Sequence, residues 1–420
     1  MLDIKFIREN QGLIKEAARK KRVEFDVQEL INADDKRLKL LKEVEEMRAE
    51  QNAQNDSIVK IKDEKEKNEA IEKMKKLKDQ LTIRENELKI TEKEWSELMF
   101  LVPNIPDPSV PEGESEADNQ EIRKRGEIPQ FDFSPKSHIE LMENLNLIDL
   151  ERGIKVAGFR GYFLKGDAAR LSMALWNFAM DKMIQKNFEP FIAPSLVKSE
   201  NLFATGHFPK SKEDVYKTQD ELYLTGTAEI PMTGYFRDEI LREEDLPKTY
   251  VAFSPCYRRE AGSHGKDTKG IYRLHEFAKV EQFILCEADH QESVKWHEEL
   301  TRNAEEILQD LGIPYRVVVN CTGDTGQANV KTYDIESWIP SEKKYRESHS
   351  SSYYHDFQAR RANIKYRTKD GKLLFAHTLN NTAIATPRIL ISILENYQQK
   401  DGSVIVPEVL RKYLNKDIIS

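Results

Sequence analysis

The sequence predicts an α+β protein in which an antiparallel helical hairpin precedes a domain built on an antiparallel β-sheet with flanking helices. Residues 28–98 contain neither Pro nor Gly and are dominated by Lys, Glu, Leu, Gln and Asn, as in long helices. From Gly126 onward, strand-like and helix-like segments follow one another without the regular alternation of a parallel sheet. Within that part, residues 253–283 have the composition of a strand, a loop and a returning strand.

Two seams of the helical part have the alternating steps of four and three residues that are typical of a coiled coil. The first seam consists of Leu40, Val44, Met47, Gln51, Gln54, Ile58 and Ile61. The second seam consists of Ala70, Met74, Leu77, Leu81, Arg84, Leu88, Thr91, Trp95 and Leu98. Because the second helix can bury the stripe of the first, we expect an antiparallel pair that forms an arm about 50 Å long.

The outer half of this arm is rich in lysine. The cluster comprises Lys60, Lys62, Lys65, Lys67, Lys73, Lys75, Lys76 and Lys78. Such a cluster can bind a phosphate backbone, but lysine and glutamate also solubilise exposed helix faces, and composition alone favours the second interpretation. The chain carries a net charge of -8 and has a pI of about 5.8, which argues against a protein that coats nucleic acid indiscriminately.

A break in composition follows the arm. The stretch "LVPNIPDPSVPEGESEADN" interrupts helix repeatedly with Pro and then becomes acidic and rich in small residues. The sequence therefore predicts an arm over 1–101, a linker over 102–125 and a second domain over 126–420.

The cysteine spacing and the hydropathy of the sequence favour a cytoplasmic location. Cys256, Cys286 and Cys321 are odd in number and have no CxxC spacing, so we expect buried reduced thiols instead of a disulfide framework or a zinc cluster. No apolar run approaches the roughly 20 residues that span a bilayer, and the first residues lack the apolar core of a secretory signal. The sequence predicts a cytoplasmic protein without a membrane partner.

The predicted hairpin carries residues suited to bind a nucleotide beside an amine. Side chains two apart on a strand point the same way, so one face can hold Arg258, Glu260, Phe277, Lys279 and Glu281. Arg258 offers planar donors for a phosphate, Phe277 a flat surface for a base, and Glu281 an acceptor for an ammonium or hydroxyl group. An ordinary surface hairpin would explain any one of these residues, but the combination favours a site.

The segment "YRREAGSHGKDTKGIYRLHEFAKVE" resembles motif 2 of the class II aminoacyl-tRNA synthetases, in the form found in seryl-tRNA synthetases. Other segments extend the resemblance over nearly the whole chain. "YLTGTAEIPMTGYF" is similar to the Thr-Ala-Glu loop of that family, "YRESHSSSYYHDFQARR" to its E-x-S-S stretch, and "HTLNNTAIATPRILISILENYQ" to motif 3. "GDAARLSMALWNFAMDKMIQK" with "FEPFIAPSLV" resembles motif 1, which builds a dimer interface, although plain core packing explains that pair equally well.

The resemblance implies a ligase that activates L-serine with ATP to seryl-adenylate and transfers serine to the 3′ end of tRNA(Ser). The ATP-binding residues that it implies are Arg258, Arg259, Glu260, Phe277, Glu347, Ser348, His349, Ser350 and Arg388. Arg258 and Arg388 would be the catalytic residues, and Glu347 with Ser350 would hold Mg²⁺, which prefers oxygen ligands. The implied serine-binding residues are Thr227, Ala228, Glu229, Glu281 and Thr382.

The resemblance also implies partners. The arm of one subunit of a homodimer would grip tRNA(Ser) docked on the other subunit, and the loop around His264 and Lys266 would guide the acceptor end. Asp324 and Glu336 would support the site from behind. Whether tRNA(Sec) is also a substrate stays open, and the stretch from Asn381 to Ala385 departs from the Gly-rich pattern of many relatives.

Two other functions remain open from the sequence. One is a class II enzyme that loads an amino acid onto a carrier protein, against which the amino-terminal arm argues. The other is a coiled-coil interaction protein with a degenerate synthetase domain, against which Arg258, Glu281 and Arg388 argue.

Overall fold

The structure is a computed structural model that describes residues 1–261, 265, 267 and 269–420. It divides into two units. The helical unit comprises Asp3–Arg19 and Val23–Pro103, and the sheet unit comprises Met1–Leu2, Lys20–Arg22 and Asn104–Ser420. His264 and Lys266, which the resemblance assigns to the acceptor end of tRNA, lie outside the described residues.

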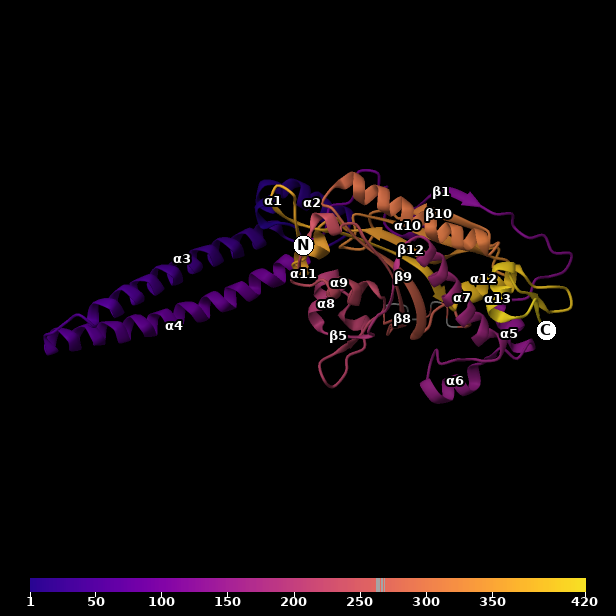
Figure 1. The fold of residues 1–420 in the computed structure, drawn as a ribbon, viewed down its shortest axis with the longest axis horizontal. Coiled ribbons are helices and arrows are strands. Elements are labelled where there is room, and N and C mark those ends of the chain that lie inside the picture. The colour runs from indigo at the N-terminus through magenta and orange to yellow at the C-terminus, as the bar shows by residue number, and fades with distance from the viewer. Residues whose placement is uncertain (262–264, 266, 268) are drawn as a thin grey trace. The chain divides into compact units, whose positions relative to one another are not determined.

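The helical unit is dominated by two long helices that run side by side (Figure 1). Its helices are α1 Ile4–Glu9, α2 Gln11–Lys20, α3 Val27–Ile58 and α4 Glu64–Leu101. Asp26 and Asp63 begin the two long helices, because each carboxylate accepts a hydrogen bond from a backbone N–H of the first turn. The predicted antiparallel hairpin is confirmed.

The seam between α3 and α4 is buried up to Val44 of α3 and from Leu77 onward in α4. Leu40 and Val44 of α3 form an apolar cluster with Leu81 and Leu88 of α4. One seam position was wrong: Arg84 is exposed and ion-pairs with Glu43 and Glu87 of the two helices.

Glu85 occupies the facing position in place of Arg84, and its Oε1 lies 2.7 Å from Arg48 Nη2. The steps from Leu81 to Glu85 and from Glu85 to Leu88 are four and three residues, so the seam keeps its alternation and passes through position 85 instead of 84.

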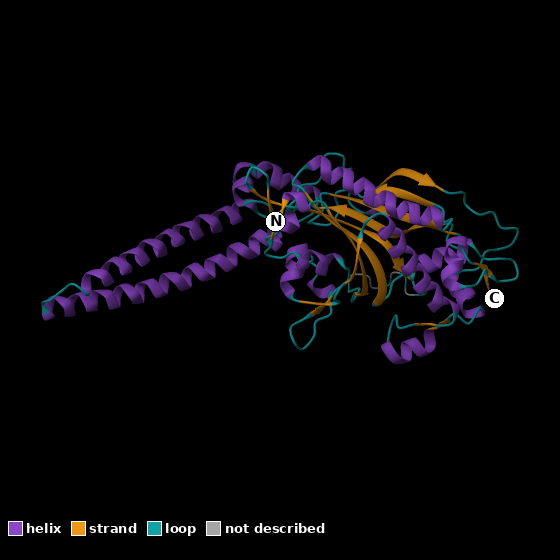
Figure 2. Ribbon diagram, in the orientation of Figure 1, coloured by secondary structure: helices purple, strands orange, loops and turns teal. Residues whose placement is uncertain are grey.

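The sheet unit is built on one eight-stranded sheet in the order β1-β10-β11-β12-β15-β9-β8-β4 (Figure 2). All neighbours are antiparallel except β4 and β8, which are parallel. These strands are β1 Gln120–Arg125, β4 Glu189–Ile192, β8 Lys248–Tyr257, β9 Glu276–Cys286, β10 Tyr315–Val319, β11 Lys331–Ile339, β12 Lys344–Tyr353 and β15 His377–Thr386. The predicted antiparallel sheet is confirmed.

Helices and short strands surround this sheet. The helices are α5 His138–Asn144, α6 Leu150–Ala157, α7 Asp167–Gln185, α8 Ser199–Thr205, α9 Glu229–Tyr235, α10 His290–Asp310, α11 Phe357–Ala362, α12 Arg388–Asn396 and α13 Glu408–Leu414, with 3₁₀ turns η1 Glu116–Asp118, η2 Lys212–Asp214 and η3 Glu243–Asp245. The short strands are β2 Ile148–Asp149, β3 Phe163–Leu164, β5 Leu196–Val197, β6 Tyr223–Leu224, β7 Ile240–Arg242, β13 Lys365–Arg367, β14 Leu373–Phe375, β16 Val404–Ile405 and β17 Ile418–Ile419.

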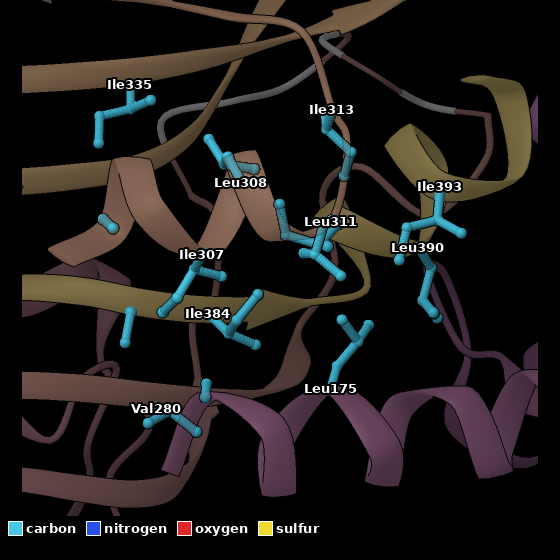
Figure 3. Packing of buried hydrophobic residues seen from close by; sticks show 14 of the residues in the cluster. Leu175, Val280, Ile307, Leu308, Leu311, Ile313, Ile335, Ile384, Leu390 and Ile393 are labelled. Atoms are coloured by element: carbon cyan, nitrogen blue, oxygen red, sulfur yellow. The ribbon is translucent and has the colours of Figure 1, made fainter. Parts of the chain in front are cut away.

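One face of the sheet packs on helices α7, α10 and α12. Figure 3 shows Leu175 of α7, Ile307 and Leu308 of α10 and Leu390 of α12 converging on this core. Val280 of β9 belongs to the same buried cluster. Because side chains alternate along a strand, the neighbours of Val280 at odd-numbered positions face the opposite side of the sheet. That opposite side carries the candidate site.

Strand β1 lies inside the range 102–125 for which the sequence predicts a linker. It pairs with β10 at the edge of the sheet. Residues before β1 are also hydrogen-bonded to the sheet unit. The backbone N–H of Asn104 donates to the carbonyl of Gln327, and that of Asp107 donates to the carbonyl of Val330. This Pro-rich stretch is therefore bound to the unit for much of its length.

The three cysteines are free and buried, as expected. Among the described residues, no helix combines the length and the hydropathy that a membrane crossing requires.

Candidate active site

A cavity of about 400 Å³ opens on the face of the sheet opposite the helical core. Every predicted site residue except Ala228 and Arg259 lines it, and these residues come from α9, β9, β12, β15, α12 and the segments beside them. The strand–loop–strand arrangement predicted for 253–283 is confirmed, with Cys256 opposite Phe277 in the β8–β9 ladder. The fold thus brings segments more than a hundred residues apart to one cavity.

One end of the cavity is basic and aromatic. The guanidinium of Arg258 lies 5.2 Å from the centre of the Phe277 ring, and Arg388 lies 4.4 Å from that of Tyr272. Arg388 begins α12, and its Nη1 lies 3.1 Å from Oε2 of Glu347. Two guanidinium groups beside half-buried aromatic rings are suited to bind phosphates and a planar base.

The nearby guanidinium groups lower the pKa of the Glu347 carboxyl. Its removal from water raises its pKa, but the attraction of Arg388 and Arg258 outweighs this effect and leaves the pKa of Glu347 below the ordinary value. The backbone carbonyl of Glu347 also accepts a hydrogen bond from the Tyr272 hydroxyl at 2.8 Å. Glu347 is therefore a fixed carboxylate at neutral pH.

The other end of the cavity is a buried polar network. Lys279 Nζ lies 2.6 Å from Oε2 of Glu281 and donates to the Thr227 hydroxyl at 2.7 Å. The Thr382 hydroxyl donates to the same carboxylate at 3.2 Å. Burial raises the pKa of Glu281, and the Lys279 ammonium opposes that rise. This end offers acceptors for an ammonium group and a small hydroxyl.

A second carboxylate completes this end. Glu229 is 7% exposed and accepts a hydrogen bond at 2.7 Å from the Gln358 amide, which in turn accepts from the Thr378 hydroxyl. Burial raises the pKa of Glu229, whereas the Gln358 hydrogen bond and the Lys279 charge lower it. Glu229 is thus held by the protein while part of it faces the cavity.

Glu260 also lines the cavity. Its carboxylate accepts a hydrogen bond from Arg273 Nη1 at 2.8 Å, and Arg160 Nη1 lies 3.8 Å away. A carboxylate at this place is the kind of acceptor that an adenine amino group requires.

Ser348 and His349 lie where two strands diverge. The His349 ring receives the Ser348 hydroxyl at 2.8 Å on one nitrogen, and its other nitrogen lies 3.1 Å from the Ala383 carbonyl. Burial lowers the pKa of His349 to about 4, so the ring is neutral and donates from Nε2 to Ala383. The β12–β15 ladder stops at Ser351, and this ring continues the connection beyond it.

The pair expected to hold Mg²⁺, Glu347 and Ser350, lines the cavity from β12. Ser350 lies opposite Asp334 of β11, and burial together with the Glu347 charge raises the pKa of Asp334. No group of three or more acidic, histidine or cysteine side chains converges in the described part of the chain as a complete metal site. A hydroxyl and a carboxylate fit Mg²⁺, which takes its other ligands from phosphate and water.

Two of the predicted residues lie elsewhere. Arg259 is turned away from the cavity and donates to the carbonyl of Glu213 at 3.0 Å. Ala228 is fully buried at the start of α9. Strand β8 ends at Tyr257, so alternation no longer fixes the direction of the residues that follow.

Sequence reasoning assigned no role to several residues that build the cavity. Strand alternation places Lys279 on the same face as Phe277 and Glu281, but its ion pair with Glu281 was not predicted. Gln358 and Tyr272 make contacts that depend on distant partners and carry no local signal. Asp324 accepts from the Asn320 amide, which also donates to Asp334, the acid that lies opposite Ser350. Glu336 binds Arg316 and lies opposite Glu347 in the β11–β12 ladder.

Known proteins share this architecture throughout. A family model described as "Seryl-tRNA synthetase N-terminal domain" matches residues 1–106, and one described as "tRNA synthetase class II core domain (G, H, P, S and T)" matches residues 212–397. A serine--tRNA ligase of Deinococcus radiodurans is 49% identical over 415 residues, which are 99% of this chain and 97% of that protein. A serine--tRNA ligase of Thermodesulfovibrio yellowstonii is 48% identical over the full length of both chains.

Solved structures agree with these relatives. The crystal structure of seryl-tRNA synthetase from Pyrococcus horikoshii complexed with ATP is 42% identical, covers 100% of this chain and 99% of that one, and has a TM-score of 0.89. A cytoplasmic serine-tRNA ligase from Naegleria fowleri in complex with AMP is 32% identical with a TM-score of 0.85, over 100% of this chain and 99% of that one. The chain therefore belongs to the seryl-tRNA synthetase family of class II aminoacyl-tRNA synthetases.

Proposed function

We propose that this protein activates L-serine with ATP and transfers the seryl group to the 3′ end of tRNA(Ser). The observation that carries this proposal is one cavity with two chemically different ends. Arg258, Arg388 and Phe277 form an end suited to a nucleotide, and Glu281 and Thr382 belong to an end suited to a small hydroxylated amine. Full-length relatives described as serine--tRNA ligases support the same reaction.

In the first step, the serine carboxylate attacks the α-phosphorus of ATP and pyrophosphate leaves. The carboxylate is already ionised at neutral pH, so no general base is required. The protein contributes alignment and positive charge, with Arg258 at the α-phosphate, Arg388 at the γ-phosphate and Phe277 stacked on adenine. In the second step, a terminal ribose hydroxyl of the tRNA attacks the adenylate carbonyl and AMP leaves.

We assign Mg²⁺ binding to Glu347 and Ser350, whose oxygens match its preferred ligands. Bound there beside the ATP phosphates, the ion would neutralise part of their charge. Glu347 is kept ionised by Arg388 and Arg258, which prepares it for a cation.

Serine selectivity is assigned to the polar end of the cavity. Glu281 and Glu229 would accept the ammonium group and the side-chain hydroxyl, and Thr382 would add a directional hydrogen bond to that hydroxyl. Alanine or glycine would leave these buried groups unpaired, which costs far more than a lost methylene contact.

The helical unit is the proposed tRNA-binding arm. Lys65, Lys73 and Lys76 lie along α4 among three glutamates, Glu64, Glu69 and Glu72, and we assign contacts with a phosphate backbone to these lysines. Double-stranded RNA is recognised largely by shape and backbone, which agrees with an arm that carries lysines and few aromatic residues. A cytoplasmic location follows from the proposed tRNA substrate.

A homodimer is the proposed assembly. Strand β4 lies at an edge of the large sheet, and its Ile192 is 85% exposed. Met173 of the neighbouring helix α7 is 55% exposed. An open strand edge beside exposed apolar side chains is suited to a second copy of the chain. Light scattering should give twice the chain mass, and Ile192→Lys should shift it toward one chain.

Amino-acid-dependent ATP–pyrophosphate exchange without tRNA tests the activation chemistry. Serine is compared with threonine, alanine, glycine and cysteine, each supplied as the only amino acid. We expect exchange with serine alone, followed by charging of tRNA(Ser) when that tRNA is added. Exchange with another amino acid would overturn the substrate. Exchange followed by transfer to a carrier protein would favour the carrier-loading enzyme. No exchange with any amino acid would favour the coiled-coil interaction protein with a degenerate synthetase domain.

A further inference from the structure

The loop over 326–329 forms one wall of the cavity, and distant residues bind all of its backbone carbonyls. The Lys21 ammonium donates to the carbonyls of Gly326 at 2.9 Å and Gln327 at 3.2 Å, and it also binds that of Asn329. Asn104 Nδ2 donates to the carbonyl of Ala328 at 2.8 Å. The loop residues themselves line the cavity.

Lys21 and Asn104 are both buried, at 4% and 3% exposure. A buried lysine costs free energy unless its ammonium is well bound, so one surrounded by carbonyls of a single loop fixes that loop firmly. Asn104 adds a second restraint through its backbone N–H, which donates to the Gln327 carbonyl at 2.9 Å.

These restraints continue to the polar end of the cavity. Asn104 Nδ2 also donates to the Tyr354 carbonyl at 2.8 Å, and Ala328 packs with Tyr354 and Phe357 in one buried cluster. The Tyr354 hydroxyl accepts from Asn380 at 3.0 Å, and both side chains contribute hydrogen bonds that lower the pKa of Glu229.

The side chain of Asn329 adds a further link, since its amide donates to the hydroxyls of Thr332 and Ser352 at 2.9 Å each. Ser352 lines the cavity as well. The loop therefore contacts the wall around Glu229 through Ser352 and Tyr354.

We propose that Lys21 and Asn104 are positioning residues for serine, which hold the loop 326–329 against Tyr354 and so fix the wall around Glu229. This inference rests on the proposed function. Neither residue touches the substrate, and their effect would be on serine affinity. ATP would be bound as before, because its proposed contacts lie at the other end.

Steady-state ATP–pyrophosphate exchange with the full-length protein tests the inference. Lys21→Met, which keeps the stem and removes the ammonium, should raise the KM for serine about tenfold, as expected for a loss of roughly one to two buried hydrogen bonds. The KM for ATP should stay unchanged. Asn104→Ala should act in the same direction, Lys21→Arg should restore part of the serine affinity, and the exposed Lys15→Met serves as the matched control.

An unchanged serine KM in folded Lys21→Met and Asn104→Ala would overturn the inference, as would equal rises in the KM values of serine and ATP. If the variants do not fold, hydrogen exchange of the wild-type protein decides. Serine with a non-hydrolysable ATP analogue should protect the amides of 326–330 more than the analogue does alone, and equal protection would overturn the inference. Wild-type protein without serine-dependent exchange would instead refute the proposed function.

Discussion

The outer arm and the cavity differ in how much of each is buried. Between residues 45 and 76 no side chain of the helical unit is fully buried, although the structure describes every residue there. In the cavity, Glu281 is 2% exposed, Lys279 6% and Thr227 4%. A surface that binds a backbone by charge needs reach and tolerates motion, whereas a site that discriminates one hydroxyl needs fixed partners.

The two units also differ in their titratable groups. All nine histidines follow residue 137, so the helical unit has none. In the sheet unit, burial lowers the pKa of His297, His349 and His377 to about 4. Acid should therefore affect the two units differently, and four measurements can break or sharpen this contrast.

Acidification from pH 7 to pH 5 should have the largest effect. Between pH 6.5 and 4 the unfolded chain binds protons that these three buried histidines do not bind, so the free energy of unfolding falls as the pH falls. The loss is about 2 kcal/mol for each histidine at pH 5.

Hydrogen exchange at pH 7 and pH 5, corrected for the intrinsic exchange rate at each pH, measures this effect. The amides of β12 and β15 should lose protection at pH 5, and those of α3 and α4 should change little. An arm that is as acid-sensitive as the sheet would contradict the contrast.

Arg258→Ala should reduce serine-dependent exchange about 10²- to 10³-fold, because a fixed charge at the reacting phosphate is lost. Arg259→Ala is the matched control, since that guanidinium binds the Glu213 carbonyl outside the cavity. Exchange kinetics at saturating serine measure both variants. Equal losses of exchange rate in the two variants would contradict the assignment of Arg258, and not Arg259, to the reacting phosphate.

Glu281→Gln should raise the KM for serine about 10- to 100-fold, because a charge-assisted hydrogen bond is lost and Lys279 keeps an unpaired charge. The KM for ATP should change little. Glu276→Gln, at an exposed position of the same strand, is the control. A rise in the KM for ATP of the same size would place Glu281 outside the serine end.

Neutralising Lys65, Lys73 and Lys76 with alanine should have the smallest effect, a rise in the KM for tRNA of about tenfold with a shallower salt dependence. Exchange without tRNA should be unchanged. Aminoacylation at several salt concentrations measures both. A matching loss of exchange would show that the arm and the cavity are not independent.

Much of the fold was readable from the sequence, because its signals are local. The heptad seams predicted the helical hairpin, and strand alternation placed Phe277, Lys279 and Glu281 on one face. Strand β1 was missed because "QEIRKR" has a single apolar residue and lies at a sheet edge, where no burial pattern is imposed.

The sequence predicted most of the residues that line the cavity, but few of the hydrogen bonds that hold them. Resemblance supplied Glu229, Ser350 and Arg388, which all line it. The Gln358 amide on Glu229 and the contact of Lys21 with a loop some three hundred residues away follow from the tertiary fold alone. Local patterns carry no information on such contacts.

The hydrogen bonds from Lys21 and Asn104 to the loop 326–329 determine where a chimera that exchanges the helical arm between relatives should be cut. In the sequence, the helical unit is interrupted at Lys20–Arg22 and ends at Pro103, directly before Asn104. A chimera cut at 23 and 103 would exchange the helices and keep the residues that brace the host's own active-site wall. A cut made at residue 106, where the match to the amino-terminal family model ends, would replace Lys21 and Asn104 along with the helices. The resulting loss of activity would be mistaken for a mismatch with tRNA.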